Sequence, residues 1–153
     1  MTPRGVAVRI TRARERELAD VAALFDAYRP FYHRPSNPRA AYRYLRARLT
    51  NHEATIFLAK EGSDAVGFTL LYPTFSSVAM RPVWILNDRY VRPNARRRGI
   101  ATRLLDHARA MATRNGAARM VLDTARADRG ARRLYSACGW SVDDEFLHYD
   151  LSR

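Results

Sequence analysis

Cysteine is almost absent from this chain of 153 residues, because Cys138 is the only one. A single cysteine cannot form an internal disulfide bond, so a disulfide-stapled fold is excluded. Such cysteine usage is typical of a reducing compartment, and we expect a cytoplasmic protein. The sequence also lacks a run of about 20 apolar residues, the length that a membrane-spanning helix needs. Met1 to Ile10 contains no apolar core of the kind found in secretory signals, and we expect no association with a membrane.

Lysine is equally scarce, since Lys60 is the only lysine among 27 basic residues. The formal net charge of +12 raises nucleic acid as a partner. However, arginines occur in every segment, and acidic residues such as Glu15 and Glu17 lie between them near the N-terminus. This distribution is typical of solvated surfaces in an arginine-biased chain, which argues against a nucleic-acid partner. The four histidines lack the spacing of metal ligands, and we expect no metal.

Apolar residues make up 47% of the sequence, and we expect residues 1–153 to form a single domain. Their spacing alternates between the period of strands and the period of helices. The predicted strands are Val6–Ile10, Thr55–Lys60, Ala65–Tyr72, Val83–Val91 and Arg119–Thr124, with one or two more within Trp140–Leu151. The predicted helices begin near Arg12, Pro38, Ile100 and Ala131 and end at Pro30, Leu49, Asn115 and Cys138. This order favours an α/β fold with one mixed sheet flanked by helices.

The run Arg96-Arg97-Arg98-Gly99-Ile100-Ala101 lies between a predicted strand and a predicted helix. Backbone N–H groups at the N-terminus of a helix have no partners within the helix, and the helix dipole adds about half a positive charge there. Such a position binds anions, and arginines pair well with phosphate. The run therefore predicts a site for a phosphate or a pyrophosphate.

Two motifs resemble those of a known family. The pattern Arg96-x-x-Gly99-x-Ala101 is similar to the Gln/Arg-x-x-Gly-x-Gly/Ala signature of the GNAT N-acetyltransferases. The segment Ala131–Trp140 resembles their second signature, an Ala-x-x-Leu-Tyr-x-x-x-Gly-aromatic run. Leu71–Ser77 and Trp84–Val91 are similar to the branch that contains the diamine (spermidine/spermine) acetyltransferases. That branch often has a glutamate where this chain has Asn87.

The resemblance implies that acetyl-CoA is the acetyl donor. It also implies a mostly antiparallel central sheet in which the strand ending at Val91 splays from the strand that begins near Met120. The pantetheine arm of the donor would then pair with the backbone of Tyr90 and Val91, and its pyrophosphate would contact the N–H groups of residues 97–102. The cofactor-binding residues implied by the family are Tyr90, Val91, Arg96, Arg97, Arg98, Gly99, Ile100, Ala101, Thr102 and Asp128. Asp128 stands where the family often has an asparagine.

Acetyl transfer to an amine needs a proton acceptor and a proton donor. Asp88 is our candidate general base, because it lies in the strand that would meet the thioester. Strand alternation places Asn87 and Asp88 on opposite faces, so Asp88 could instead face away and pair with an arginine. Tyr135 stands where the family has a tyrosine that protonates the leaving thiolate, although its helical position also suits a core residue.

The expected acceptor is the primary amine of a small molecule, such as a polyamine or an amino acid. Tyr28, Tyr32 and Asn87 are candidate residues for binding it, although the two tyrosines suit a packing role equally well. A protein lysine or a protein N-terminus is an alternative acceptor. A non-catalytic module that binds CoA or nucleic acid is an alternative of another class. The resembled branch commonly forms dimers, and we expect a homodimer.

Overall fold

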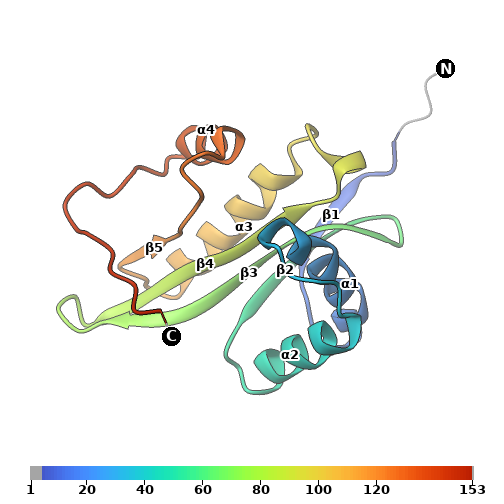
Figure 1. Cartoon of the computed structure of the whole chain (residues 1–153), viewed down its shortest axis with the longest axis horizontal. Helices are drawn as coiled ribbons and strands as arrows, with labels where there is room; N and C mark the ends of the chain where they lie inside the picture. The colour runs from blue at the N-terminus through green and yellow to red at the C-terminus, as the bar shows by residue number, and fades with distance from the viewer. Residues whose placement is uncertain (1–4, 153) are drawn as a thin grey trace. The chain divides into compact units, whose positions relative to one another are not determined.

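The computed structural model describes residues 5–152, and Figure 1 shows its ribbon. Residues up to Asp123 form one compact unit, and Thr124–Arg153 form another. The strands are β1 (Val8–Arg12), β2 (Thr55–Glu61), β3 (Asp64–Ser76), β4 (Arg81–Val91) and β5 (Arg119–Val121). The α-helices are α1 (Leu18–Tyr28), α2 (Pro38–Thr50), α3 (Ile100–Arg114) and α4 (Arg129–Ala137). Short 3₁₀ helices are η1 (Glu15–Glu17), η2 (Arg29–Tyr32) and η3 (Pro93–Ala95).

The first unit contains a single five-stranded sheet with the spatial order β1-β2-β3-β4-β5. The first four strands are antiparallel to their neighbours, and only β5 runs parallel to β4. This confirms the predicted mixed, mostly antiparallel sheet. Among residues 5–152, no helix is both long and apolar enough to cross a membrane.

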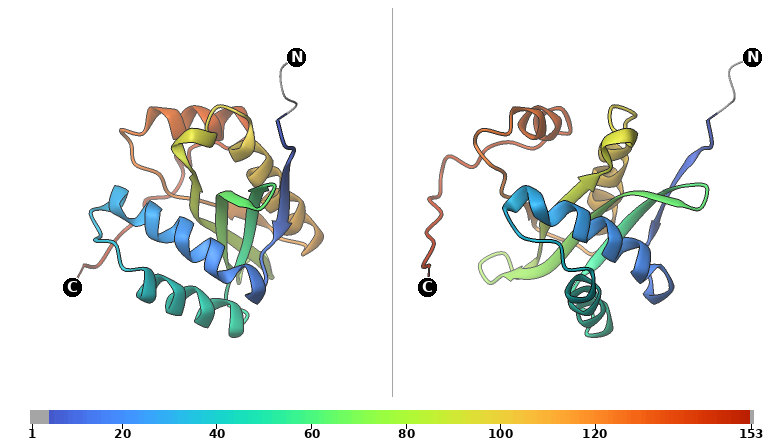
Figure 2. Two further views of the ribbon diagram at one scale, coloured as in Figure 1. Left: turned by 90° about the vertical axis from the view of Figure 1, so that its right-hand side faces the viewer. Right: turned by 45° about the vertical axis from the view of Figure 1, so that its right-hand side comes forward.

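Helices cover both faces of this sheet (Figure 2). Ile56, Leu58, Phe68 and Leu70 belong to the core that α1 and α2 cover. The intervening Phe57 points to the other face, where its ring lies 5.9 Å from that of His107 on α3. The apolar stripe of α3 is buried, and it consists of Ile100, Leu104, Leu105, Ala108, Met111 and Ala112.

Strand β4 has a strand partner on both sides only near its beginning. Its whole length pairs with β3, whereas β5 pairs only with Val83–Ile85. The second edge of β4 from Leu86 to Val91 therefore has no strand partner within the described chain. This is the splay that the sequence predicted between the two central strands. It leaves an open edge of backbone next to the loop that leads into α3.

The predicted boundaries are wrong near the N-terminus. Strand β1 extends to Arg12, where a helix was expected to begin, because Arg12 pairs with Phe57 of β2. The Arg12 side chain also reaches β2, where Nη2 donates to Thr55 Oγ1 at 3.2 Å. The N–H of Ala13 continues this pairing by donating to the Ile56 carbonyl at 2.8 Å. Helix α1 begins only at Leu18, after η1.

The second unit contains α4 and a C-terminal segment without regular secondary structure. The strand predicted within Trp140–Leu151 is absent from the described residues. The Asp143 carboxylate accepts hydrogen bonds from the N–H groups of Glu145 (3.0 Å) and Phe146 (3.2 Å), which bends the backbone in the middle of that segment. The apolar positions also lose strict alternation at Phe146 and Leu147. Both features explain why a strand prediction fails there.

Candidate functional site

The loop between η3 and α3 displays a row of unpaired backbone N–H groups. Arg97 has φ 61° and Gly99 has φ 75°, so both adopt the left-handed conformation. The first hydrogen bond of the helix runs from the N–H of Arg103 to the Gly99 carbonyl at 3.1 Å. Within the described part of the chain, the N–H groups of residues 97–102 therefore donate no hydrogen bond. This geometry suits an anion at the N-terminus of α3.

The three consecutive arginines of this loop have different surroundings. Arg96 turns inward, where its Nε donates to the Val91 carbonyl at 2.9 Å. Arg98 pairs with Glu61 on β2, with 2.5 Å between Nη2 and Oε2. The side chain of Arg97 forms no hydrogen bond or ion pair with any residue in 5–152. Of the three guanidinium groups, that of Arg97 is therefore the one that needs to break no contact within residues 5–152 to bind a phosphate.

The open edge of β4 presents the backbone of Val91 rather than that of Tyr90. The N–H of Arg92 donates to the Val66 carbonyl at 2.8 Å, so the backbone of Arg92 faces β3. Alternation then turns Val91 toward the open edge and Tyr90 toward β3. The Tyr90 carbonyl indeed lies 2.9 Å from the position that a Cβ on Gly67 would take. Of Tyr90 and Val91, it is therefore Val91 whose backbone is placed to pair with an extended ligand along this edge.

A β-bulge interrupts β4 at Asn87. Asp88 pairs with Leu70, and Leu86 pairs with Leu71, which leaves Asn87 without a partner on β3. The Asn87 side chain reaches its neighbour, because Nδ2 donates to the Asp88 carboxylate at 2.9 Å. The prediction that these two side chains lie on opposite faces of a regular strand is therefore wrong.

The carboxylate of Asp88 is largely buried and is held by neutral donors. Burial raises the pKa of Asp88, and hydrogen bonds from the side chains of Asn87 and Tyr28 partly offset this effect. Among the described residues, Asp88 forms no ion pair with an arginine, which was the alternative that its position left open. A carboxylate with a raised pKa is better suited to accept a proton near neutral pH.

Aromatic side chains line the region between the end of α1 and β4. The ring of Tyr28 lies 5.1 Å from that of Tyr32 and 5.8 Å from that of Tyr90. Tyr28 belongs to the edge of the core, whereas Phe31 and Tyr32 in η2 are 61% and 63% exposed. Packing therefore explains Tyr28 in part, while Tyr32 is accessible to a ligand.

Two further tyrosines near Asp88 were not singled out from the sequence. The hydroxyl groups of Tyr44 on α2 and Tyr72 on β3 are 2.5 Å apart. Burial, the hydrogen bond with Tyr44 and the negative charge of Asp88 raise the pKa of Tyr72. Tyr44 also lies under the guanidinium of Arg48, 4.9 Å from its Cζ. In the sequence both tyrosines resemble ordinary half-buried aromatic positions, so no signal distinguished them.

The second unit contains the two other predicted site residues. Asp128 caps α4, because its Oδ1 accepts the N–H of Ala131 at 3.0 Å. Tyr135 is half-buried, and its ring centre lies 6.1 Å from that of Trp140. Their roles toward a cofactor or a substrate remain predictions from the resemblance.

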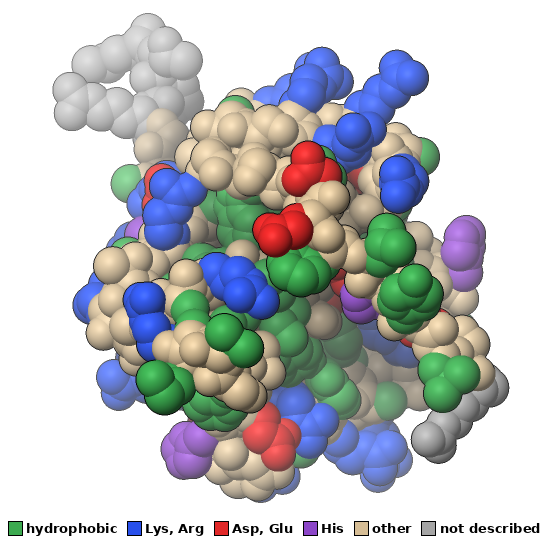
Figure 3. Space-filling view, turned by 90° about the vertical axis from the view of Figure 1, so that its left-hand side faces the viewer, with side chains coloured by type: hydrophobic (Ala, Val, Ile, Leu, Met, Phe, Trp, Pro, Cys, Tyr) green, Lys and Arg blue, Asp and Glu red, His purple; other side chains and the backbone are tan. Residues whose placement is uncertain are grey.

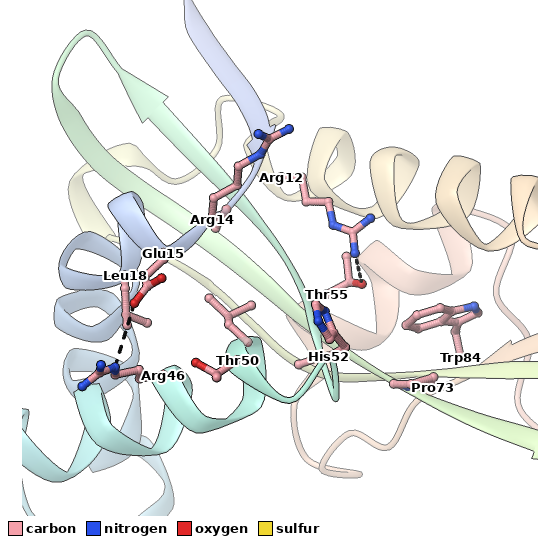
Figure 4. A pocket seen from close by; sticks show the side chains of 13 residues that line it. Arg12, Arg14, Glu15, Leu18, Arg46, Thr50, His52, Thr55, Pro73 and Trp84 are labelled. Carbon is pink, nitrogen blue, oxygen red and sulfur yellow. Dashed lines mark hydrogen bonds and ion pairs between the residues drawn. The ribbon is translucent and has the colours of Figure 1, made fainter.

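A cavity of about 500 Å³ lies near the beginning of β4, away from the residues described so far (Figure 4). Arg12, Arg46, His52 and Trp84 are among its lining residues, and none of the predicted site residues lines it. In Figure 4 the guanidinium groups of Arg14 and Arg46 point outward rather than toward a common centre.

Figure 3 shows basic side chains scattered among apolar and acidic ones on one face of the molecule. Within residues 5–152, no metal-binding group of His, Cys, Asp and Glu side chains is present.

The sequence and fold define the family. The sequence model of the acetyltransferase (GNAT) family matches residues 21–140. The chain therefore belongs to the GNAT family of N-acetyltransferases, whose members use acetyl-CoA. This confirms the family predicted from the two motifs, while the diamine acetyltransferase branch remains a prediction.

Individual relatives agree with this assignment. An uncharacterized N-acetyltransferase of Bacillus subtilis strain 168, YhfO, is 44% identical over 143 residues, which cover 94% of this chain and 96% of the relative. The crystal structure of a probable acetyltransferase has a TM-score of 0.90 at 39% identity and covers 95% of this chain and 97% of that one. An aminoglycoside N-acetyltransferase, AAC(6')-Iy, in complex with CoA has a TM-score of 0.81 at 22% identity, with 99% of each chain covered. At that identity the likeness concerns the fold alone.

Proposed function

We propose that this protein transfers the acetyl group of acetyl-CoA to the primary amine of a small molecule. The observation that carries the proposal is the row of unpaired N–H groups at residues 97–102 beside the open edge of β4. A pyrophosphate would accept hydrogen bonds from the row, and the N–H of Val91, whose carbonyl already accepts from Arg96 Nε, would donate to an amide carbonyl of a pantetheine arm. Acetyl-CoA would supply the acetyl group as a thioester, which an amine can attack directly.

The carboxylate of Asp88 is the proton acceptor in this proposal. A free alkylammonium has a pKa of about 10.4, so deprotonating it at pH 7 costs about 4–5 kcal/mol. Asp88 takes this proton, and its raised pKa makes it a better acceptor than a solvated carboxylate. The amine nitrogen then forms a bond to the acetyl carbon as the carbon–sulfur bond breaks. The nitrogen releases its second proton to water, from which Tyr135 regains the proton that it gives to sulfur. Asn87 and Tyr28 orient the carboxylate, and Tyr135 donates a proton to the departing sulfur, as the family motif implies.

Charge narrows the class of acceptor. The chain has a net charge of +12, and the cluster of Tyr28, Tyr44, Tyr72 and Asn87 contains a single carboxylate, that of Asp88. One carboxylate balances one ammonium group, whereas a polyamine brings several positive charges to a basic protein. An amino acid or a similar amine with one cationic centre is therefore our preferred acceptor over a polyamine. A protein lysine or N-terminus is the alternative acceptor. A single domain, a homodimer and a cytoplasmic location remain predictions.

The test is the release of CoA across a panel of amines that includes amino acids, polyamines, aminoglycosides and a basic peptide. The wild-type protein should release CoA with at least one amine. Tyr135→Phe should lower that rate about 10²-fold if the phenol acts as general acid. Tyr149→Phe is the matched control, because Tyr149 lies in the same unit and is 86% exposed.

An unchanged rate in Tyr135→Phe would remove Tyr135 from the mechanism. The absence of CoA release with every amine would instead favour a non-catalytic module. Strongly salt-dependent binding to a polynucleotide would then support the nucleic-acid alternative.

A further inference from the structure

Arg96 makes contacts within the protein that binding of a phosphate would not require. Its Nε donates to the Val91 carbonyl at 2.9 Å, and this carbonyl belongs to the open edge of β4. The guanidinium carbon also lies 5.9 Å from the ring centres of both Phe31 and Tyr90. A single side chain thus contacts the last residue of β4, a buried ring of the core and an exposed ring of η2.

These contacts join two regions that serve different parts of the proposed reaction. Val91 lies at the edge where acetyl-CoA would bind, whereas Phe31 precedes Tyr32, an exposed candidate residue for binding the acceptor. The ring of Phe31 is also 6.1 Å from that of Tyr90, and the ring of Tyr90 is 5.8 Å from that of Tyr28. Because Tyr28 donates to Asp88, the chain of contacts runs from Arg96 to the candidate base.

We infer that Arg96 is a positioning residue, which fixes η2 and its aromatic side chains against the cofactor edge of β4 and thereby shapes the acceptor site. This inference rests on the proposed acetyltransferase function. It gives Arg96 a different role from that of its neighbour Arg97, whose guanidinium remains available to the phosphates of acetyl-CoA. The planar guanidinium is essential to this role, because it donates to a carbonyl and lies near two rings at once. A lysine would retain the charge and lose that combination.

The kinetic test compares Arg96→Ala, Arg96→Lys and Arg97→Ala with an amine that the wild-type protein acetylates. Arg96→Ala should raise the KM for the acceptor about tenfold, the effect of losing one hydrogen bond and two long cation–π contacts, and leave the KM for acetyl-CoA within about twofold. Arg96→Lys should show most of the same acceptor defect. Arg97→Ala should do the reverse, with a raised KM for acetyl-CoA and an unchanged KM for the acceptor.

A second measurement needs no substrate. Chymotrypsin cleaves after Phe31 and Tyr32, and cleavage there requires the 3₁₀ turn of η2 to unfold and detach from its contacts with Arg96 and Tyr90. Arg96→Ala and Arg96→Lys should be cleaved there several times faster than the wild-type protein, whereas Arg97→Ala should be cleaved at the wild-type rate. Arg96→Lys also keeps the test available if Arg96→Ala does not fold.

A double-mutant cycle of Arg96→Ala and Phe31→Ala should be non-additive in the KM for the acceptor, because each substitution removes the same contact. The inference is overturned if Arg96→Ala raises only the KM for acetyl-CoA, or if cleavage in η2 is unchanged in both Arg96 variants. If no amine yields CoA, the proposed function fails, and the proteolysis still decides whether Arg96 holds η2.

Discussion

Alanine substitutions of the glycines at the two ends of α3 separate the effect of backbone strain on stability from the effect on ligand binding. Gly99 precedes the helix with φ 75°, and Gly116 follows it with φ 68°. A Cβ added at either position would meet no atom within 4 Å, so neither alanine variant creates a clash within the protein. The left-handed conformation costs a non-glycine residue about 1–2 kcal/mol. Gly99→Ala and Gly116→Ala should therefore each lower the free energy of unfolding by about 1 kcal/mol. For a protein of this size, such a loss lowers Tm by about 2–4 °C.

The two variants should differ in their affinity for CoA. Gly99 lies within the row of N–H groups at residues 97–102, so a changed φ re-aims the donors on which a pyrophosphate depends. We expect Gly99→Ala to raise the Kd for CoA at least tenfold, which corresponds to about 1.4 kcal/mol. Gly116→Ala lies at the other end of the helix and should leave this Kd within about twofold.

Isothermal titration calorimetry with CoA, beside thermal melts of both variants, measures these quantities. The reasoning is refuted if both substitutions weaken CoA binding equally, because general destabilisation would then explain the loss. It is also refuted if Gly99→Ala binds CoA as the wild-type protein does, since the loop would then not be the pyrophosphate site.

Substitutions at two further positions test the roles of Asp88 and Asp128. Asp88→Asn should lower CoA release about 10²-fold and abolish the rise in rate with pH that the ionisation of Asp88 produces, as a pH–rate profile would show. Because burial raises the pKa of Asp88 in the folded protein, its protonated form stabilises the fold, and this contribution is lost as the pH rises through the folded pKa. Asp88→Asn should therefore be at least as stable as the wild-type protein at pH 7 in a thermal melt, and a large loss there would contradict the burial argument. Asp128→Ala should cost about 1 kcal/mol of stability through the lost cap of α4, whereas Asp128→Asn should keep most of it. If Asp128 is only a cap, neither change should alter the Kd for CoA by more than about twofold.

The elements that the sequence predicted well have strong local signals at both ends. Helix α3 was expected from Ile100 to Asn115 and ends at Arg114, because left-handed glycines at 99 and 116 bound a clear apolar stripe. Helix α2 was expected from Pro38 and begins there, after the Asn37 side chain that accepts the N–H of Ala40 at 3.1 Å. The residues at the ends of these two helices were therefore sufficient to predict where the helices begin or end.

The sequence indicated which residues belong to the candidate site, but it indicated less well which partners their side chains contact. Sequence alone predicted an anion site at the N-terminus of α3, where the N–H groups of residues 97–102 have no partner among the described residues, and the anion itself stays a prediction. The sequence treated Arg96, Arg97 and Arg98 alike, because the targets of their side chains are distant in sequence. Glu61 is 37 residues from Arg98, and no local pattern links the two. The partners of long side chains depend on tertiary packing, which a linear pattern does not record.

The bulge at Asn87 shows most clearly why the candidate base could not be oriented from the sequence. Alternation holds only while each residue of β4 has one partner on β3, and the register shifts between Leu70 and Leu71. One inserted residue brings the amide of Asn87 to the carboxylate of Asp88. The buried hydroxyl of Thr69 also donates to the Asp88 carbonyl at 2.8 Å, which holds the backbone immediately after the bulge. The irregular point of the strand is thus fixed at the residue that the proposed reaction needs. A bulge there places Asn87 and Asp88 where one hydrogen-bonds the other, an arrangement that a regular strand would not allow.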